Sequence, residues 1–557
     1  MWYLNGFSLG EWTLCLLACC VPVTGSSAGG KGSVQEDTVS GGMNVLLLIV
    51  DDLRTSLGCY GDSVVKSPNI DQLASRSVIF TNAYAQQAVC APSRVSFLTG
   101  RRPQTTRLFD FKSYWRTHAG NFSTLPQYFK EHGYETMSVG KVFHPGSSDS
   151  QRGAYPMRFS CFLRAQPAII KPENQQGFLG IFLYHKPKEE KSARKTRQQC
   201  PSESCVLSGK LVQSIHPKEH SIRLHNGILY QGRELSSWLS GGVCASHLTV
   251  PQFGKEFLNL YPIENVTLAP DPYIPKKLPL VAYNPWTDIR KREDVQALNI
   301  SFPFGPIPKH FQLLIRQSYY ASVSYLDTQI GKLLSTLNNL ELSNNTIVVF
   351  ISDHGWSLGE HGEWAKYSNF DVTTRVPLMF YVPGVTSIQQ SKEPTFEYID
   401  PFKHGLSNKL PGISRDVPVE LVSLFSTIVE LAKLPVPPDC PTPSFHVELC
   451  TEGQSIVQYF DMPKEENNSD VAAFSSYPRP SDTPQWNSDL PDLKDIRVMG
   501  YSKRTVDYRY TVWVGYNPVT FEANFTDIHA QELYLVKSDP NQDDNLLNNS
   551  LRYESYL

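Results

Sequence analysis

Two short apolar stretches stand out in the hydrophobic pattern of the chain. Residues 44–50, NVLLLIV, and residues 346–351, TIVVFI, each have a single polar residue, at the first position. Apolar runs of this length without alternation are typical of strands covered on both faces, as in a parallel sheet. Polar side chains follow each run, Asp51-Asp52 in the first case and Ser352-Asp353-His354 in the second. Since ligand sites in open α/β sheets lie at the carboxyl ends of strands, the pattern predicts that these side chains share one sheet edge.

Helical and extended segments alternate between these runs. A possible N-cap at Thr124, followed by a proline, opens a predicted helix that ends near Gly133. The next stretch, YETMSV (134–139), is predicted to be a strand, and residues 308–339 carry apolar side chains at the spacing of a long core helix. This alternation predicts an α/β fold.

The C-terminal part of the chain has a different pattern. The stretch VMGYSKRTVDYRYTVWVGY (498–516) alternates polar and apolar side chains and is rich in aromatic ones, which is typical of antiparallel strands. We therefore expect an N-terminal domain over residues 43–450 and a smaller subdomain over residues 455–557. Residues 147–250 fit neither pattern and include a charge run, KPKEEKSARKTRQQ, that is most simply a solvated loop.

The N-terminus favours entry into the secretory pathway. Within residues 1–28, an apolar run over residues 12–23 precedes small residues, which indicates a signal peptide rather than a poorly ordered terminus, although Glu11 intrudes. No later apolar run reaches about 18 residues, so we expect no membrane span. Seven Asn-x-Ser/Thr triplets add weak support: Asn121, Asn265, Asn299, Asn344, Asn467, Asn524 and Asn548.

Charge and cysteine content narrow the picture further. The formal net charge is −3 over 557 residues, so the chain has no global excess of positive charge with which to bind nucleic acid. Of the 11 cysteines, Cys440 and Cys450 enclose a proline-rich loop, PTPSFHVEL. We expect these two to form a local disulfide in an oxidising compartment.

The polar groups that follow the two apolar runs resemble a cation site. The three carboxylates would repel one another unless a cation lay between them, and hard oxygen ligands favour Ca²⁺ or Mg²⁺. The alternative is that these residues are isolated strand-end caps. The residues concerned are Asp51, Asp52, Asp353 and His354.

Residues 89–100, VCAPSRVSFLTG, read as a short helix that begins at Cys90 and ends at Gly100, with a proline in its first turn. The helix dipole favours negative charge at Cys90, and Arg94 can share its face. This combination suits an oxyanion such as sulfate or phosphate. From the residues alone, a thiolate nucleophile and a buried structural cysteine both remain possible.

The segment Cys-Ala-Pro-Ser-Arg, continuing to Thr-Gly, resembles the signature of the sulfatase family, Cys-x-Pro-x-Arg. The resemblance implies an alkaline-phosphatase-like α/β fold, with a large, mostly parallel sheet flanked by helices and a smaller C-terminal subdomain that has an antiparallel sheet. It also implies that a formylglycine-generating enzyme converts Cys90 to 3-oxoalanine (formylglycine), whose aldehyde hydrates. One hydroxyl of the hydrate would attack sulfur, and the other would later help to expel sulfate.

The resemblance also assigns roles residue by residue. One Ca²⁺ ion would be held by Asp51, Asp52, Asp353, His354 and modified Cys90. Arg94 would steady the nucleophile, Lys141 and Lys366 would hold sulfate oxygens, and His144 would orient or deprotonate the hydrate. Trp356 fits either a pocket wall for the sugar or a packed core position.

Further segments, among them SDHGWSLGEHGEWAKYSNFD and YPRPSDTPQWNSD, are similar to family members that remove the 2-sulfate of terminal L-iduronate from heparan sulfate and dermatan sulfate. The resemblance covers about residues 43–146 and 252–557. It implies a lysosomal enzyme that binds sulfated glycosaminoglycan oligosaccharides and is delivered by the mannose-6-phosphate receptor.

One segment departs from the family pattern. In Tyr184-His185-Lys186-Pro187-Lys188, Lys188 stands where the family has a second histidine that binds sulfate and protonates the leaving oxygen. A lysine is a poor proton donor at neutral or acid pH. His247 is a conceivable substitute, and an insertion and a splice variant are the two interpretations of residues 147–250. Two alternatives stay open: a catalytically impaired secreted glycoprotein that binds sulfated glycosaminoglycan, and a related phosphatase or phosphodiesterase.

Overall fold

The structure is a computed structural model that describes residues 42–139, 141–144, 178–185, 255–386, 396–403, 412–461 and 471–547. The expected signal peptide (1–28), most of the segment 147–250 with Lys188 and His247, and two of the seven sequons lie outside these residues. In the described ranges, no helix combines the length and apolar character needed to cross a bilayer.

The main sheet is built around the two apolar runs. β1 (Asn44–Val50) and β5 (Thr346–Ser352) are parallel neighbours, with Val50 opposite Ser352, so their carboxyl ends meet as predicted. The described strands are ordered β10-β2-β8-β5-β1-β4-β3, and β9 also pairs with β2. The remaining strands of the sheet are β2 (Val78–Tyr84), β3 (Tyr134–Val139), β4 (Phe178–His185), β8 (Arg375–Tyr381), β9 (Ile413–Arg415) and β10 (Val419–Glu420).

The sheet is mixed, whereas the family resemblance implied a mostly parallel one. Among the described pairings, β1–β5, β2–β10 and β2–β9 are parallel. The pairings β1–β4, β3–β4, β2–β8 and β5–β8 are antiparallel. The physical reason is that a strand buried on both faces has a continuous apolar sequence in either direction, so its pattern does not reveal the direction.

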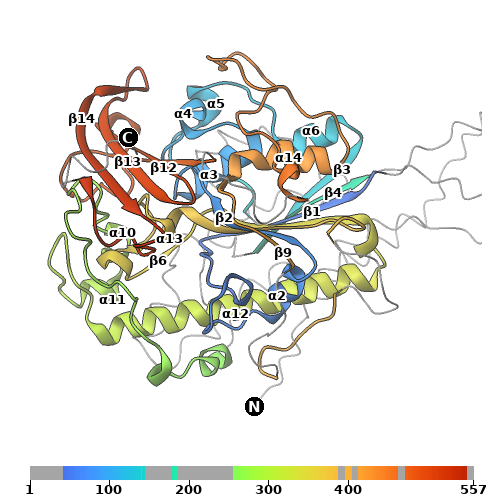
Figure 1. Cartoon of the computed structure of the whole chain (residues 1–557), viewed down its shortest axis with the longest axis horizontal. Helices are drawn as coiled ribbons and strands as arrows, with labels where there is room; N and C mark the ends of the chain where they lie inside the picture. The colour runs from blue at the N-terminus through green and yellow to red at the C-terminus, as the bar shows by residue number, and fades with distance from the viewer. Residues whose placement is uncertain are drawn as a thin grey trace, which may run out of the picture.

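Helices cover both faces of this sheet (Figure 1). α2 (Pro68–Ala74) and α12 (Lys309–Asn339) lie on one face, and α3 (Cys90–Thr99), α6 (Leu125–Glu131) and α14 (Leu424–Leu431) lie on the other. Side chains of β1 alternate between the two cores: Leu46, Leu48 and Val50 pack toward α12, while Val45, Leu47 and Ile49 pack toward α3 and α14. The α/β prediction and the long helix are therefore confirmed.

Shorter elements connect these layers. They are η1 (Gly58–Tyr60), α4 (Pro103–Thr106), α5 (Trp115–His118), η3 (Lys255–Leu260), η4 (Ile263–Asn265), α10 (Thr287–Arg290), α11 (Glu293–Gln296), η5 (Ser343–Asn345), β6 (Ser357–Leu358), η6 (Glu360–Gly362), β7 (Trp364–Ala365), α13 (Asp371–Thr374), η7 (Leu421–Ser423), η8 (Val457–Tyr459) and η9 (Leu493–Asp495).

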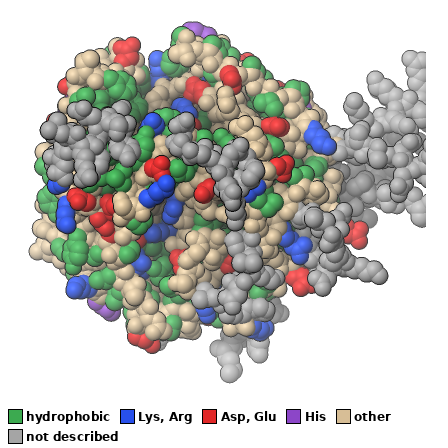
Figure 2. All heavy atoms as spheres, viewed as in Figure 1, with side chains coloured by type: hydrophobic (Ala, Val, Ile, Leu, Met, Phe, Trp, Pro, Cys, Tyr) green, Lys and Arg blue, Asp and Glu red, His purple; other side chains and the backbone are tan. Residues whose placement is uncertain are grey.

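The C-terminal part forms a second sheet, as its alternating pattern predicted. β11 (Ala473–Arg479), β12 (Val498–Arg504), β13 (Tyr508–Asn517) and β14 (Glu522–Leu535) are antiparallel in chain order. This sheet lies beside the end of the main sheet that carries α13 and β6 (Figure 1). On the face of the molecule shown in Figure 2, acidic and basic side chains of the described residues are intermingled.

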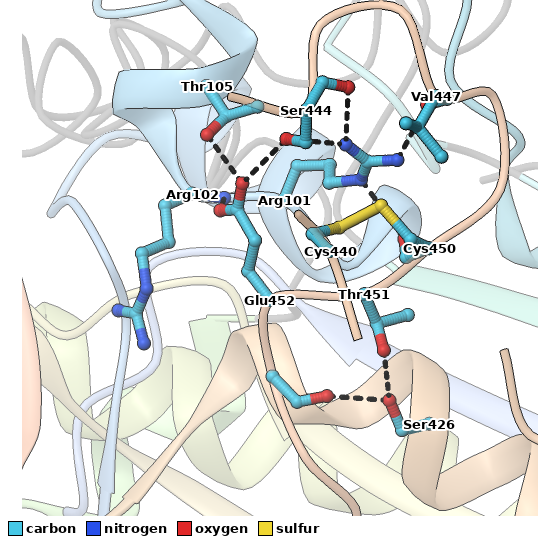
Figure 3. Close-up of a disulfide and its surroundings, with 11 residues drawn as sticks. Arg101, Arg102, Thr105, Ser426, Cys440, Ser444, Val447, Cys450, Thr451 and Glu452 are labelled. Atoms are coloured by element: carbon cyan, nitrogen blue, oxygen red, sulfur yellow. Dashed lines mark hydrogen bonds between the residues drawn. A yellow bond between two sulfur atoms is a disulfide. The ribbon is translucent and has the colours of Figure 1, made fainter. Parts of the chain in front are cut away.

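A disulfide joins Cys440 to Cys450, as expected, and Figure 3 shows how its loop holds the end of α3. Arg101, just beyond that helix, donates to the carbonyls of Cys450 at 3.0 Å and Val447 at 2.8 Å. Glu452 accepts from the backbone N–H of Arg102 at 2.7 Å. Gly100 ends α3 with φ +67°, a left-handed conformation that favours glycine. The C-terminal end of the Cys90 helix is thus fixed by a cross-linked loop.

Candidate active site

The carboxyl ends of β1 and β5 bring together polar side chains that are far apart in the sequence. The backbone N–H of Asp353 donates to the carbonyl of Val50 at 3.1 Å, and that of Asp52 donates to Asp353 Oδ1 at 3.2 Å. Asp52 has φ +59°, so the chain turns sharply as it leaves β1. Asp51, Asp52, Asp353 and His354 are all almost fully buried.

Cys90 is the first residue of α3 and points into this cluster. Its Sγ lies 3.3 Å from His354 Nε2 and 3.1 Å from Lys366 Nζ, and the residue is fully buried. The helix N-terminus and the sheet edge therefore form one site. In the described chain, ligand atoms of Asp51, Asp52, Cys90 and His354 lie within 4.8 Å of one another.

Arg94 links the acids of the two strands to α3. Its Nε donates to Asp353 Oδ2 at 2.8 Å, and its Nη2 donates to Asp51 Oδ1 at 2.9 Å. It also donates to the carbonyl of Lys141, and its side chain is fully buried. A buried guanidinium bound to two carboxylates has little freedom, so Arg94 fixes the orientation of both acids.

Two buried lysines complete the charge balance. Lys141 Nζ lies 2.9 Å from Asp51 Oδ1 and 3.0 Å from its Oδ2. Lys366 Nζ lies 2.9 Å from Asp52 Oδ1 and is surrounded by the rings of Trp356, Tyr367 and Phe111 at 5.6–5.9 Å. The site thus holds three carboxylates against three side-chain cations, and two of those cations lie on flexible stems that can turn toward a bound anion.

The surroundings of Cys90 keep its thiol protonated. Burial, followed by the charge of Asp51, raises the pKa of this thiol to about 12, although Lys141 and Lys366 act in the opposite direction. The helix dipole alone favoured a thiolate, but the structure places acids beside the sulfur as well. The unmodified side chain is therefore a weak nucleophile at neutral pH.

His144 lies at the rim of the same site. Its ring stacks on Phe111 with 4.2 Å between ring centres, and the side chain is partly buried. Burial, followed by the charge of Lys141, lowers the pKa of His144 to about 3. The imidazole is consequently neutral from weakly acid to neutral pH.

Comparison with known proteins decides the family. The sulfatase family profile matches residues 43–209 and 267–432, which together are more than half of the chain and include part of the segment 147–250. The chain belongs to the sulfatase family. It is 57% identical to iduronate 2-sulfatase of Homo sapiens over 524 residues and 56% identical to that of Mus musculus over 528 residues, with 93% of each chain covered in both cases.

More distant relatives agree with this assignment. A sulfatase of Formosa agariphila is 27% identical over 444 residues, covering 76% of this chain and 73% of its own length. The crystal structure of the phosphonate monoester hydrolase of Agrobacterium radiobacter superposes with a TM-score of 0.52 at 18% identity, over 92% of this chain and 93% of that one. That likeness concerns the fold alone, and it confirms the α/β fold that the resemblance implied.

The donor set of this sulfatase fits a divalent cation. His354 Nδ1 lies 2.9 Å from the carbonyl of Gly355, which can only accept, so Nδ1 carries the proton. Burial lowers the pKa of His354, which leaves Nε2 with a lone pair directed at Cys90. Carboxylates and a neutral imidazole are suitable ligands for such an ion. Asp353 is outside the closest group, and its Oδ1 lies 3.8 Å from His354 Nε2.

Trp356 was open to two interpretations, and its position favours the packed one. It is 1% exposed and belongs to the core that includes α12. Its ring lies 5.6 Å from Lys366 Nζ, so it also forms part of the apolar wall around that ammonium group. Burial of the lysine within aromatic rings excludes water from its charge and strengthens its electrostatic effect.

The segment that carries Lys366 is held in place by residues whose supporting role the sequence pattern does not indicate. Ala365 and Tyr367, on either side of the lysine, both have positive φ, at +68° and +80°. Three buried arginines of the C-terminal sheet bind this segment. Arg479 donates to Tyr367 O at 2.8 Å, Arg509 donates to Asn369 O at 2.9 Å, and Arg504 binds Asp371 at 3.0 Å. The second sheet therefore supports the strained backbone around Lys366.

A second group of possible ligands, Asp271, His361 and Asp543, lies elsewhere in the described chain. His361 Nε2 is 2.6 Å from the carbonyl of Asn541 and 3.1 Å from Asp271 Oδ2. Because a carbonyl can only accept, Nε2 is protonated and is already used as a hydrogen-bond donor. We interpret this group as a link between the C-terminal segment and η6, and we assign no ion to it.

Proposed function

We propose that the chain hydrolyses the 2-sulfate ester of terminal L-iduronate in heparan sulfate and dermatan sulfate. The observation that carries the proposal is Cys90, in the segment Cys-Ala-Pro-Ser-Arg, at the N-terminus of α3 with Lys366 Nζ 3.1 Å from its sulfur. The high identity to the human and mouse iduronate 2-sulfatases, over nearly the whole of each chain, supports the choice of substrate.

Conversion of Cys90 to formylglycine would supply a hydrated aldehyde, whose hydroxyl is a better nucleophile for sulfur than the protonated thiol. Arg94 holds Asp51 and Asp353 in place beside that position. Lys141 and Lys366 turn their ammonium groups to the sulfate oxygens, where they offset the charge that grows as the ester oxygen leaves. His144, neutral at the working pH, would orient the hydrate or accept its hydroxyl proton.

Asp51, Asp52, Asp353, His354 and the modified residue 90 are the side chains that would hold Ca²⁺. When bound, the ion would supply positive charge next to the sulfate group and would polarise the hydroxyl groups of the hydrated aldehyde. The net reaction breaks the bond between sulfur and the ester oxygen, adds one water molecule, and releases sulfate and a free sugar hydroxyl.

The proposed location is the lysosome, reached through the secretory pathway by way of the mannose-6-phosphate receptor. Support comes from the apolar N-terminal run and from the sequon asparagines of the described chain, which all lie on the surface: Asn121, Asn265, Asn299, Asn344 and Asn524. Surface exposure is required for attachment of the glycans that such a receptor recognises.

A second candidate is a glycoprotein that binds sulfated glycosaminoglycan without turning it over. Lys188 favours it, because the family has a proton-donating histidine at that position. The choice between the two affects only the proton transfer to the leaving ester oxygen, since nucleophile and sulfate-binding groups would be the same.

The test uses the purified chain, expressed together with a formylglycine-generating enzyme. We expect release of sulfate from a disaccharide with a terminal iduronate 2-sulfate, and we expect the tryptic peptide of residue 90 to have the mass of the aldehyde. Cys90→Ser should fold and have no activity. Turnover by protein whose Cys90 peptide is unmodified would contradict the proposal, and binding without turnover, restored by Lys188→His, would favour the second candidate.

A further inference from the structure

Two carboxyl groups, one buried and one partly buried, lie together beside the Lys366 segment, and neither belongs to the signature of the family. Asp288 is in α10, and Asp489 is in the loop between β11 and η9. The backbone N–H of Asp288 donates to Asp489 Oδ2 at 3.2 Å, across 201 positions of the sequence. Asp489 is 3% exposed. The two segments are therefore in direct contact through an acid pair.

Each carboxyl group has one oxygen without a donor. Asp288 Oδ1 accepts from the N–H of Ile289 at 2.7 Å, and Asp489 Oδ2 accepts from Asp288. The other oxygens, Asp288 Oδ2 and Asp489 Oδ1, are buried and have no hydrogen-bond partner. The hydroxyls of Thr287 and Tyr367 are near enough to affect the pair, but neither reaches bonding geometry with those two oxygens. Buried acceptors without donors are costly and need an explanation.

Several contacts fix the pair beside Lys366, the residue proposed to hold a sulfate oxygen. The charges of Lys366 and Asp52 both act on Asp288. Asn284, four residues before Asp288, donates to the carbonyl of Lys366 at 2.5 Å. On the other side, Arg479 binds both Tyr367 O at 2.8 Å and Ser488 O at 3.1 Å, so the residue before Asp489 is held against the Lys366 segment.

We propose that Asp288 and Asp489 form a hydroxyl-binding pair, whose two unpaired oxygens accept hydrogen bonds from free hydroxyl groups of the sugar ring that carries the sulfate ester. This inference rests on the proposed function, because it requires the sulfated group to be a sugar. Ring hydroxyls are the donors that such a substrate brings, and hydrogen bonds between hydroxyls and buried carboxyl oxygens discriminate strongly against ligands that lack them.

The charge of the pair is compatible with an anionic substrate. Burial raises the pKa of both carboxyl groups. For Asp489, burial together with the nearby charge of Asp288 raises the pKa to about 7. Below neutral pH the two carboxyls therefore share at least one proton, which reduces their repulsion of sulfate. A protonated carboxyl can also donate to a ring oxygen. The pair thus suits an enzyme that works in acid surroundings.

The experiment compares two substrates in the full-length, formylglycine-containing enzyme. One is the disaccharide with terminal iduronate 2-sulfate, and the other is 4-methylumbelliferyl sulfate, which has no sugar hydroxyls. We expect Asp288→Ala and Asp489→Ala each to lower kcat/KM for the disaccharide about 10- to 100-fold, mainly through KM, and to change it less than about twofold for the aryl sulfate. Asp489→Asn, which keeps one acceptor oxygen, should recover most of the loss.

The matched control is Asp492→Ala, an acid three residues further on whose side chain is exposed and pairs with Lys112. It should leave both substrates unaffected, and thermal unfolding of every variant checks its fold. In addition, a disaccharide that lacks the ring hydroxyl next to the ester should be a poor substrate for the wild type and should show no further loss in Asp489→Ala.

The alternative outcomes are distinct. Equal losses on both substrates would show that the pair acts by positioning Lys366, and unchanged kinetics on both would show a structural link only, so either result overturns the proposal. A wild-type enzyme that cleaves the aryl sulfate but not the disaccharide refutes the proposed substrate, and this inference with it.

Discussion

Replacing Arg509 by methionine would test whether the C-terminal sheet supports the catalytic segment. Arg509 is 1% exposed in β13, donates to Asn369 O at 2.9 Å and pairs with Glu532 at 3.3 Å. Glu532 is equally buried and also accepts from Trp513 Nε1 at 2.8 Å. The substitution keeps much of the volume but leaves the Glu532 carboxylate without a counter-charge and Asn369 O without a donor.

The expected loss follows from these contacts. Removing one partner of a buried ion pair costs about 3–5 kcal/mol, most of it from the charge that remains buried. We also expect kcat to fall about tenfold or more, because the backbone around Lys366 is strained on both sides and small displacements at an active site are expensive. The Lys366 ammonium group, proposed to bind sulfate, would lose its position before the protein lost its fold.

Urea unfolding and steady-state kinetics measure the two effects, with Arg497→Met as the control, since Arg497 is an exposed arginine next to β12. In the double variant Arg509→Met/Glu532→Gln no charge remains, so at least about 2 kcal/mol of the stability should return. The kcat defect should persist, because Asn369 O is still without its donor. Additive stability changes in the double variant, or a full return of kcat with stability, would refute the reasoning.

Three further predictions concern the site and the loop that supports it. Lys366→Met should lower kcat/KM about 100-fold or more, since its ammonium lies 3.1 Å from Cys90 Sγ, and the exposed Lys403→Met is the control. The double variant Cys440→Ser/Cys450→Ser should have a free energy of unfolding lower by about 3 kcal/mol in urea, because the disulfide closes a loop with a sequence separation of 10. A reductant should no longer change the stability of this variant. The pKa of Asp489 is raised to about 7 in the folded state from an ordinary value of 3.8, so its stabilising effect is complete below about pH 4 and is lost as the pH rises through 7. Urea unfolding between pH 4.5 and 8 should show that the free energy of unfolding of the wild type falls by up to about 4 kcal/mol more than that of Asp489→Asn. Parallel pH profiles for the wild type and the variant would contradict the assignment.

The convergence of the candidate site could be predicted because its parts are local. Asp51 and Asp353 directly follow strands whose apolar sequences place them next to each other at the sheet centre, and parallel pairing of neighbours brings their ends to one edge. Cys90 begins a helix with a readable start and stop. Each of these features depends on a few consecutive residues, and the geometry of strands and helices supplies the rest.

The support of the site could not be predicted in the same way. Arg479 and Arg509 donate to backbone carbonyls, and Asp489 accepts from a backbone N–H, in each case more than 100 positions away, and no periodicity records such pairings. In a sequence, a buried arginine in an antiparallel strand reads as an ordinary polar position of the alternating pattern. Strand direction could not be predicted for a related reason, since β8 is apolar after its first residue and fits the sheet either way.

The two sheets of this sulfatase consequently position different parts of the candidate site. The main sheet and α3 bring Cys90, the proposed nucleophile position, and the acids of the site together, while the C-terminal sheet and α10 place groups around Lys366. A change in the first set removes the reaction outright, as Cys90→Ser should do. A change in the second set shifts the position of a charge or an acceptor by a fraction of an ångström, so it should alter kcat or substrate choice while the fold survives. Variation in substrate preference among relatives with the same signature is therefore expected to follow α10 and the loop after β11 rather than the residues around Cys90.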